Sequence, residues 1–222
     1  MSVSQRGLVE PFHVMEVVKA ATERQRTHGD AIALCVGQPG TPAPAPVLAA
    51  ASSALGGQQL GYTEAAGVWE FRQRIARHYA EAYGAAVDPA EVIVTTGSSG
   101  GFLLTLLAAF GAGELVAMAR PGYPAYRNDI LSVGGRLLEL PVGERTRYQP
   151  SVALLEALPE KPRGLVLASP SNPTGTIIDA AELAAIAAWC LANDCLLISD
   201  EIYHGISYGR PCASARQFGT GA

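Results

Sequence analysis

Between residues 92 and 200, short apolar runs alternate with longer segments of helical periodicity, and this alternation constrains the fold more than any other feature. The predicted strands span residues 92–95, 115–119, 137–140, 164–168 and 196–199. The predicted helices between them span residues 100–110, 123–133, 151–158 and 179–193. Near-continuous apolar strands joined by helices are typical of a parallel sheet that is covered on both faces. We therefore expect an α/β fold with three layers (αβα) and a mostly parallel sheet.

The segment before this alternation has a different pattern. Helical spacing of apolar residues predicts helices over residues 11–28, 47–55 and 68–83, and residues 32–36 form a short apolar run of strand type. Between them, Gly-Gln-Pro-Gly at residues 37–40 and three further prolines indicate an arm that wraps over a surface. We expect residues 1–45 to form an N-terminal arm with part of a small domain, and residues 46–222 to form a large domain.

Composition excludes several classes of protein. Of the 222 residues, 49% are hydrophobic and 16% are charged, which fits a packed domain and not a disordered chain. The net charge of −4 gives no basic face for nucleic acid. The sequence contains no apolar tract long enough to span a membrane, and its first ten residues lack the apolar core of a signal peptide. We expect a soluble, cytoplasmic protein.

The end of the first predicted strand leads into a glycine-rich and serine-rich turn. The segment Val-Thr-Thr-Gly-Ser-Ser-Gly-Gly-Phe places Gly97, Ser98, Ser99 and Gly100 at the start of a helix. Free backbone N–H groups and the helix dipole favour an anion at such a point, and the two hydroxyls add donors. A tight turn that needs glycine for conformational reasons alone would give the same pattern.

Three more strand ends carry polar or aromatic residues. Tyr123 stands between two prolines that stiffen its backbone, Asn172 stands between two prolines in Ser-Pro-Ser-Asn-Pro-Thr-Gly, and Asp200 ends an apolar strand shortly before Tyr203. Each has a structural alternative: a core tyrosine, a turn asparagine, or a surface acid that caps the next helix. Ligands of open α/β sheets bind outside the carboxyl ends of the strands. Together the motifs indicate a flat, phosphorylated ligand with a basic ring nitrogen.

These motifs, in this order, resemble those of the class I/II aminotransferases, which are pyridoxal 5′-phosphate (PLP) enzymes of fold type I. The resemblance extends from Val-Gly-Gln-Pro-Gly near residue 37 to Ser-Asp-Glu-Ile-Tyr at residues 199–203. It implies that residues 46–222 are a PLP-binding large domain, incomplete at its C-terminal side. It also implies an enzyme of amino-acid metabolism and biosynthesis that moves an amino group between an amino acid and a 2-oxo acid.

The resemblance implies a role for each candidate residue. Gly97, Ser98, Ser99 and Gly100 hold the cofactor phosphate, Tyr123 stacks on the pyridine ring, Asn172 and Tyr203 bind its phenolic oxygen, and Asp200 pairs with the protonated ring nitrogen. Such a pair keeps the ring cationic, so that it accepts electrons. Tyr62 reaches the phosphate of a neighbouring subunit, which implies a homodimer. Gly37 belongs to a loop that closes over the substrate carboxylate. No metal is implied.

The chain departs from the family in one respect. The lysine that forms the Schiff base with PLP lies beyond the Asp-Glu-Ile-Tyr motif in this family, and the two lysines present, Lys19 and Lys161, are in other contexts. We therefore assign no catalytic residue, and expect a fragment that is inactive alone and has exposed sheet edges. The alternatives are another PLP reaction on this scaffold, such as a β-lyase or decarboxylase, and a non-catalytic PLP-binding or interaction protein.

Overall fold

The computed structural model describes residues 4–219, and the chain divides into two compact units. One unit comprises Met1–Glu10 with Ala66–Ala222, and the other comprises Pro11–Ala65. The predicted boundary between residues 45 and 46 stays a prediction of the domain organisation. All the strands of the structure, and the residues predicted at their ends, belong to the first unit.

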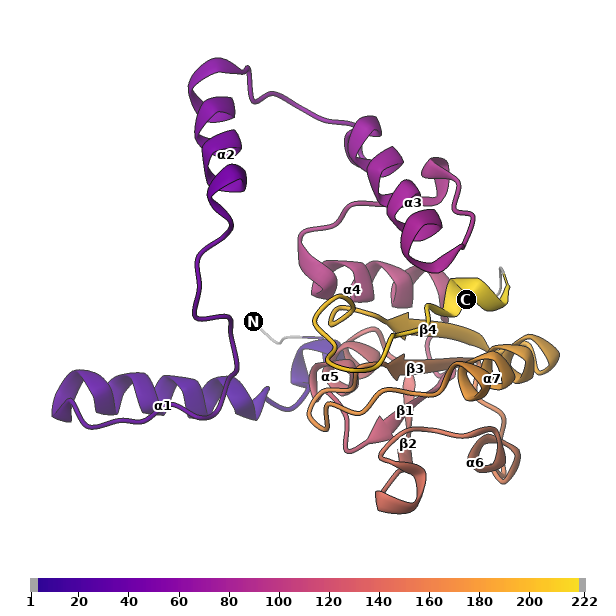
Figure 1. The fold of residues 1–222 in the computed structure, drawn as a ribbon. Helices are drawn as coiled ribbons and strands as arrows, with labels where there is room; N and C mark the ends of the chain where they lie inside the picture. Colours follow the sequence, from indigo (N-terminus) through magenta and orange to yellow (C-terminus); the bar gives the residue numbers. More distant parts are fainter. Residues whose placement is uncertain (1–3, 220–222) are drawn as a thin grey trace. The chain divides into compact units, whose positions relative to one another are not determined.

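The first unit is built on a parallel sheet of four strands in the order β2-β1-β3-β4 (Figure 1). The strands are β1 (Leu115–Arg120), β2 (Arg136–Pro141), β3 (Gly164–Ala168) and β4 (Leu196–Asp200). Every pairing is parallel, and Ala168 of β3 lies opposite Asp200 of β4. The predicted α/β class with a mostly parallel sheet is confirmed, and four of the six predicted strands form within about a residue of their expected bounds.

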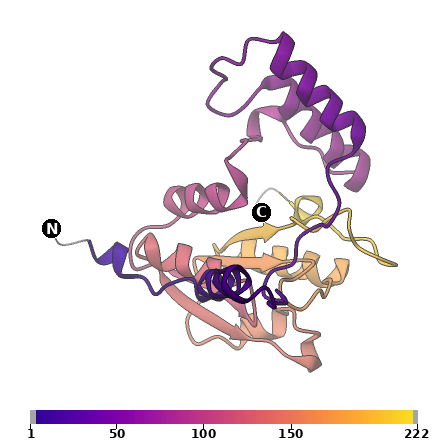
Figure 2. The same ribbon diagram turned by 90° about the vertical axis from the view of Figure 1, so that its left-hand side faces the viewer.

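Helices cover both faces of this sheet, because alternate strand residues point to opposite sides. On one face, α4 (Gly97–Ala109) and α5 (Ala125–Ser132) supply Leu106 and Ile130, which pack with Val116 and Val166. On the other face, α6 (Val152–Glu156) and α7 (Ala180–Ala192) supply buried side chains that pack with Leu165 and Leu197. The sheet therefore lies between the two sets of helices (Figure 1; Figure 2).

Two predicted strands are absent. Residues 92–95 begin with an extended residue, Val92, but form no ladder with any strand in the described part of the chain; Val94 donates its N–H to the Ala66 carbonyl instead, at 2.9 Å. Residues 32–36 also pair with no strand within the described ranges; they contain a bend at Cys35, and Ile32 and Leu34 are largely exposed. Both predictions were wrong for the same reason. Apolar and β-branched residues favour an extended backbone, whereas a strand also needs a neighbouring strand with which to form hydrogen bonds.

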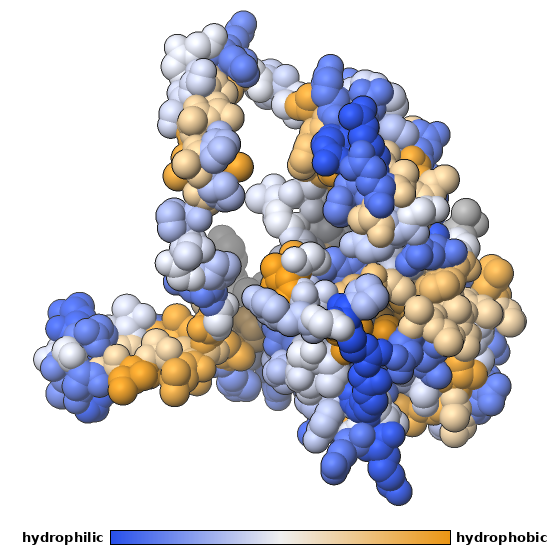
Figure 3. Space-filling view, in the orientation of Figure 1, coloured by the Kyte–Doolittle hydropathy of each residue, from blue (hydrophilic) through white to orange (hydrophobic). Residues whose placement is uncertain are grey.

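The remaining helix of the first unit is α3 (Trp69–Tyr83). Short 3₁₀ turns lie at Gln5–Leu8, Pro89–Glu91, Glu144–Thr146 and Ala215–Phe218. The second unit consists of α1 (His13–His28) and α2 (Ala45–Gly57), and neither helix has a buried residue. Apolar side chains lie on the surface along α2, including Val47, Leu48 and Leu55 (Figure 3). Among residues 4–219, no helix has the length and apolar character needed to cross a bilayer.

Candidate functional site

The candidate site is formed by loops that leave the carboxyl ends of β1, β3 and β4. Tyr123 follows β1, Asn172 follows β3, and Tyr203 follows Asp200, the last residue of β4. Since these three strands are adjacent and parallel, the loops that follow them meet at one edge of the sheet. The structure therefore brings together four of the predicted site residues, from parts of the sequence up to about 80 residues apart.

Asp200 is held by two hydrogen bonds. Its Oδ1 accepts the backbone N–H of Ile202 at 3.0 Å, which turns the chain sharply after β4. Its Oδ2 accepts the hydroxyl of Tyr126, a residue of α5, in a short hydrogen bond. Each carboxylate oxygen has a second lone pair, so the group can accept a further donor from a ligand. These contacts fix the direction of the carboxylate before any ligand is present.

Tyr126 supplies a rigid donor because its ring is buried and packed on both sides. Its exposed fraction is 4%. Phe102 of α4 lies with its ring centroid 4.8 Å from that of Tyr126, and Tyr123 makes an edge-on contact at 5.3 Å. Burial, and then the hydrogen bond to Asp200, raise the pKa of Tyr126 well above its ordinary value, so the phenol stays protonated and donates.

Sequence reasoning did not single out Tyr126 as a site residue. It ends the motif Arg-Pro-Gly-Tyr-Pro-Ala-Tyr, in which only Tyr123 received a role. A signal was available, since Tyr126 is a second tyrosine only three residues after Tyr123 in the same motif. What the sequence could not supply is the contact between Tyr126 and Asp200, because the two residues are 74 positions apart in the chain.

Asn172 and Tyr203 are in direct contact, as their expected shared role requires. The amide Nδ2 of Asn172 donates to the hydroxyl of Tyr203 at 3.3 Å. The Asn172 loop is itself fixed, because Ser171 donates its N–H to the Thr176 carbonyl at 2.9 Å, and Gln149 donates its side-chain amide to the Ala168 and Thr176 carbonyls. The loop also contains cis peptide bonds before Pro170 and Pro173.

His204 ties the loop after β4 to the loop after β3 and to α3. Its Nε2 lies 2.9 Å from the carbonyl oxygen of Ser169, and its Nδ1 lies 2.8 Å from the hydroxyl of Tyr83. The side chain of His204 is 8% exposed, so these contacts are shielded from water. Because Tyr203 precedes His204, this network holds the position from which Tyr203 reaches Asn172. His204 had no predicted role in the site.

Tyr123 lies beside the other members of the cluster. Its hydroxyl is close enough to Tyr203, Asp129 and Asp200 for their charges to act on it, although burial is the main reason why the pKa of Tyr123 is raised. Its ring contacts Tyr126 edge-on and is half-buried. Tyr123, Tyr126 and Asn172 also line one small cavity, together with Ser171 and Gln149. One aromatic face and several polar groups thus converge on a single space.

The residues predicted to bind an anion lie at the N-terminus of α4. Gly97 has a left-handed φ of 72°, which glycine adopts without strain, and Thr96 at the N-cap makes no side-chain capping bond. The first N–H groups of a helix have no partner inside the helix and can bind an anion. In α4, Gly97 donates its N–H to the Thr95 carbonyl at 2.9 Å, so the N–H groups of Ser98 and Ser99 are the candidates. Ser98 and Ser99 are exposed beside them. Phe102, on the next turn of α4, packs on Tyr126 and links this terminus to the cluster.

Tyr62 and Gly37 lie outside the unit that contains this cluster. Both residues belong to the second unit, and both are exposed. Tyr62 was predicted to act on a neighbouring subunit and Gly37 through loop closure, so their roles stay predictions.

Together, the fold and the site define an α/β protein that can hold a flat, anionic ligand at the carboxyl edge of a parallel sheet. The chain belongs to the family described as "Aminotransferase class I and II", which matches residues 29–220. It is 54% identical over 213 residues to a valine–pyruvate aminotransferase of Mycobacterium tuberculosis, in a match that covers 96% of this chain and 55% of the relative.

Solved structures agree with the family. An aminotransferase from M. tuberculosis superposes with a TM-score of 0.93 at 53% identity, covering 99% of this chain and 57% of that one. Aspartate aminotransferase from Thermus thermophilus, solved with maleate, superposes with a TM-score of 0.93 at 28% identity, covering 98% of this chain and 58% of that one. The chain therefore spans about half the length of the relatives it matches.

The family uses PLP, and the residues present fit this cofactor. A phosphate suits the uncapped N-terminus of α4, a planar ring suits the half-buried face of Tyr123, and a protonated ring nitrogen suits the carboxylate of Asp200. A phenolic oxygen suits the neighbouring hydroxyl and amide of Tyr203 and Asn172. The donors and acceptors of the site thus match the chemical groups of PLP in kind.

Proposed function

We propose that this chain is the PLP-binding part of an amino-acid aminotransferase. The observation that carries the proposal is the cluster at the carboxyl edge of the sheet, in which Tyr126 orients Asp200 while Asn172 contacts Tyr203. Bound PLP supplies an electron sink for the carbanion of an amino-acid substrate. Family membership supports the reaction class, which is transfer of an amino group between an amino acid and a 2-oxo acid.

Each residue then has a defined task. Asp200 binds the protonated ring nitrogen and keeps the ring cationic, and Tyr123 packs against one face of the ring. Asn172 and Tyr203 donate hydrogen bonds to the phenolic oxygen. The N–H groups of Ser98, Ser99 and Gly100 bind the phosphate, with the serine hydroxyls as further donors. Gly97 shapes this turn through its left-handed φ, and its own N–H donates to the Thr95 carbonyl at 2.9 Å.

The Schiff-base lysine has no candidate among the two lysines of this sequence. Lys161 precedes β3, and its ammonium lies 4.8 Å from the centre of the Trp189 ring. Strand β3 separates it from the Asn172 loop by about 16 Å at roughly 3.3 Å per residue. Lys19 lies on α1 in the second unit. We therefore propose that the 222 residues bind PLP without catalysing transamination.

The whole protein's substrates and assembly are proposals from the relatives. The identity to a protein named valine–pyruvate aminotransferase supports an aliphatic amino acid and pyruvate as the substrate pair. We further propose a homodimer, in which Tyr62 of each subunit contacts the phosphate bound by the other, and in which Gly37 contributes to closure over the substrate carboxylate.

The test is a titration of the purified 222-residue chain with PLP and with pyridoxamine 5′-phosphate, followed by the fluorescence of the cofactor and of the two tryptophans. Pyridoxamine 5′-phosphate has no aldehyde, so it reports binding without any Schiff base. Asp200→Asn removes a charged acceptor, which is worth about 1.5–3 kcal/mol, and should weaken binding at least about tenfold. The matched control is Asp194→Asn, since Asp194 is 92% exposed and has a left-handed φ that asparagine tolerates.

Two outcomes would contradict the proposal. The first is saturable binding that Asp200→Asn and Asp194→Asn affect equally, which would place the cofactor elsewhere. The second is appreciable formation of pyruvate or glutamate by the chain alone, because it would require a catalytic lysine that the site does not contain.

A further inference from the structure

Gln149 is a buried polar residue that neither the sequence motifs nor the proposed function uses. It lies between β2 and α6 and is 5% exposed. An amide is costly to bury unless it is hydrogen-bonded. The Nε2 of Gln149 donates to the carbonyl oxygen of Ala168 at 3.2 Å and to that of Thr176 at 2.8 Å, and it lies 3.3 Å from the Thr176 hydroxyl. The buried amide therefore joins two separate positions of the backbone.

These two positions are the ends of the loop that carries Asn172. Ala168 is the last residue of β3, and Thr176 lies beyond Asn172 in the chain. Ser171 donates its N–H to the Thr176 carbonyl at 2.9 Å, which is the same oxygen that Gln149 contacts. A carbonyl oxygen has two lone pairs, so it can accept both donors. Gln149 therefore closes the base of this loop, and it lines the same small cavity as Asn172.

The backbone before Gln149 is held in an unusual conformation. Arg147 and Tyr148 have φ values of 53° and 57°, in the left-handed region that non-glycine residues rarely adopt. Such residues cost free energy and persist only where the surrounding structure fixes them. Here the N–H of Tyr148 donates to the Gly143 carbonyl at 2.8 Å, and the N–H of Gln149 donates to the Thr146 carbonyl at 3.1 Å. This strained turn directs the side chain of Gln149 into the core, where it is buried.

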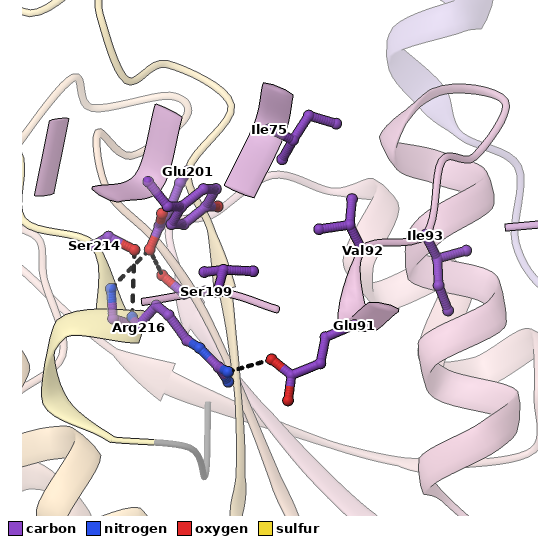
Figure 4. Close-up of a pocket in the computed structure, with 11 residues that line it drawn as sticks. Ile75, Glu91, Val92, Ile93, Ser199, Glu201, Ser214 and Arg216 are labelled. Carbon is purple, nitrogen blue, oxygen red and sulfur yellow. Dashed lines mark hydrogen bonds and ion pairs between the residues drawn. The ribbon is translucent and has the colours of Figure 1, made fainter. Parts of the chain in front are cut away.

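A separate network supports the same loop, so Gln149 can be varied alone. The Nε2 of His204 lies 2.9 Å from the Ser169 carbonyl oxygen, and its Nδ1 lies 3.8 Å from Oε2 of Glu201. Figure 4 shows Glu201 at a different cavity, where its Oε1 accepts the hydroxyl of Ser199 at 3.0 Å. These contacts involve none of the acceptors of Gln149. Loss of the Gln149 amide therefore leaves this second support in place.

We propose that Gln149 is a positioning residue for the phenolic oxygen of the cofactor. By holding the two ends of the loop together, it fixes the direction in which Asn172 presents its amide. The inference rests on the proposed function, in which Asn172 and Tyr203 bind this oxygen. A donor that is ordered before binding gives more affinity than a mobile one, because less conformational freedom is lost on binding. Loss of the Gln149 amide should therefore weaken the binding of only those ligands that have a phenolic oxygen.

The first measurement needs no ligand. Gln149→Glu keeps the shape of the side chain and replaces its donor by an oxygen, which when ionised cannot donate to the two carbonyl groups. Amide hydrogen exchange then reports on the loop. We expect the N–H of Ser171 to exchange at least about tenfold faster in this variant, while that of Ala117 in β1 keeps its rate. Gln73→Glu, at an exposed position of α3, is the matched control and should change neither rate.

The second measurement compares the binding of two ligands, pyridoxamine 5′-phosphate and its 3-deoxy analogue, which lacks the phenolic oxygen. We expect Gln149→Glu to weaken binding of the first at least about tenfold and of the second less than about threefold, whereas Gln73→Glu affects neither. A merely structural role would weaken both alike. Burial raises the pKa of a carboxyl group, and the introduced group can donate once it is protonated. The selective loss should therefore shrink as the pH falls from about 8 to about 6.

Gln149→Met covers the case in which Gln149→Glu does not fold, because it keeps the length of the side chain and adds no charge. It should show the same selective loss without the dependence on pH. Equal losses for both ligands, or an unchanged exchange rate at Ser171, would overturn the inference and leave the proposed function intact. If the wild-type chain binds neither ligand, the proposed function is contradicted, and this inference with it.

Discussion

At the scale of single residues, the hydrogen bond between Tyr126 and Asp200 is the contact that most directly orients the carboxylate of the site. The hydroxyl is held by a buried ring, and the carboxylate is held by its own turn. Hydrogen bonds to charged groups contribute about 1.5–3 kcal/mol. We expect Tyr126→Phe, which keeps the ring and removes the hydroxyl, to lower the free energy of unfolding by that amount at pH 7. Urea denaturation followed by circular dichroism measures it.

The same substitution has a predictable dependence on pH. The folded state raises the pKa of Tyr126 above its ordinary value of 10.0. Folding therefore favours the protonated phenol, and this contribution is complete below about pH 10 and decreases above it. In that range the wild-type chain should lose up to about 1.4 kcal/mol per pH unit that Tyr126→Phe does not lose. A stability difference that stays constant from pH 8 to pH 11, or grows, would contradict this account.

Several residues of the candidate site could be predicted because each lies at a recognisable strand end. Asp200, Asn172 and Tyr123 could be predicted in this way, and the structure brings them together. Tyr126 and His204 could not be predicted, because their roles depend on which loops lie next to each other. A sequence specifies strand ends locally, whereas the order β2-β1-β3-β4 is decided by packing over the whole domain.

At the scale of elements, β3 and α4 pack closely at Gly164. A Cβ atom at this position would lie 2.3 Å from Cζ of Phe110, which follows α4, and 2.7 Å from its Cε1. We expect Gly164→Ala to destabilise the fold by about 1–3 kcal/mol, because the ring must move within a filled core. Thermal unfolding measures the effect. Adding Phe110→Leu should restore part of the loss, and Gly143→Ala, where nothing lies within 4 Å, is the control.

The hydrogen bond from α3 to the loop after β4 can be tested in the same way. Tyr83→Phe removes the contact with His204 and keeps the ring packing, so we expect a loss of about 0.5–1.5 kcal/mol. The matched variant is Tyr208→Phe, because Tyr208 is 94% exposed, and it should be neutral within about 0.5 kcal/mol. Equal effects of the two substitutions would show that the contact adds nothing to stability.

At this scale, the positions of the strands along the chain were more predictable than their pairing. Strands β1 to β4 were identified because their apolar runs are bounded by glycine, proline or polar residues. Residues 92–95 have the same signature and yet pair with no described strand. A window of sequence carries the preference of a segment for extended backbone, but it contains no information about whether a partner strand is present.

At the scale of the whole molecule, burial is distributed unevenly between the two units. The first unit contains both hydrophobic clusters, whereas α1 and α2 have no buried residue. Local opening requires little free energy where few apolar contacts are broken. We expect amides of β1 and β3, such as those of Ala117 and Leu165, to exchange with deuterium at least about a hundredfold more slowly than those of residues 13–57. Mass spectrometry after timed labelling measures the difference. Similar rates in the two units would contradict it.

The contacts of His204 also fix which ring nitrogen carries the proton and the direction of its hydrogen bonds. The Ser169 carbonyl only accepts, so the proton of a neutral ring lies on Nε2, and Nδ1 receives the proton of Tyr83. The Tyr83 hydroxyl, the His204 ring and the Ser169 carbonyl therefore form a chain of hydrogen bonds. The donated protons in this chain all point from α3 toward the loop of Asn172. In nitrogen-15 spectra the two ring nitrogens should therefore resonate far apart, as a pyrrole-type and a pyridine-type atom, in place of the averaged signal of a freely exchanging imidazole.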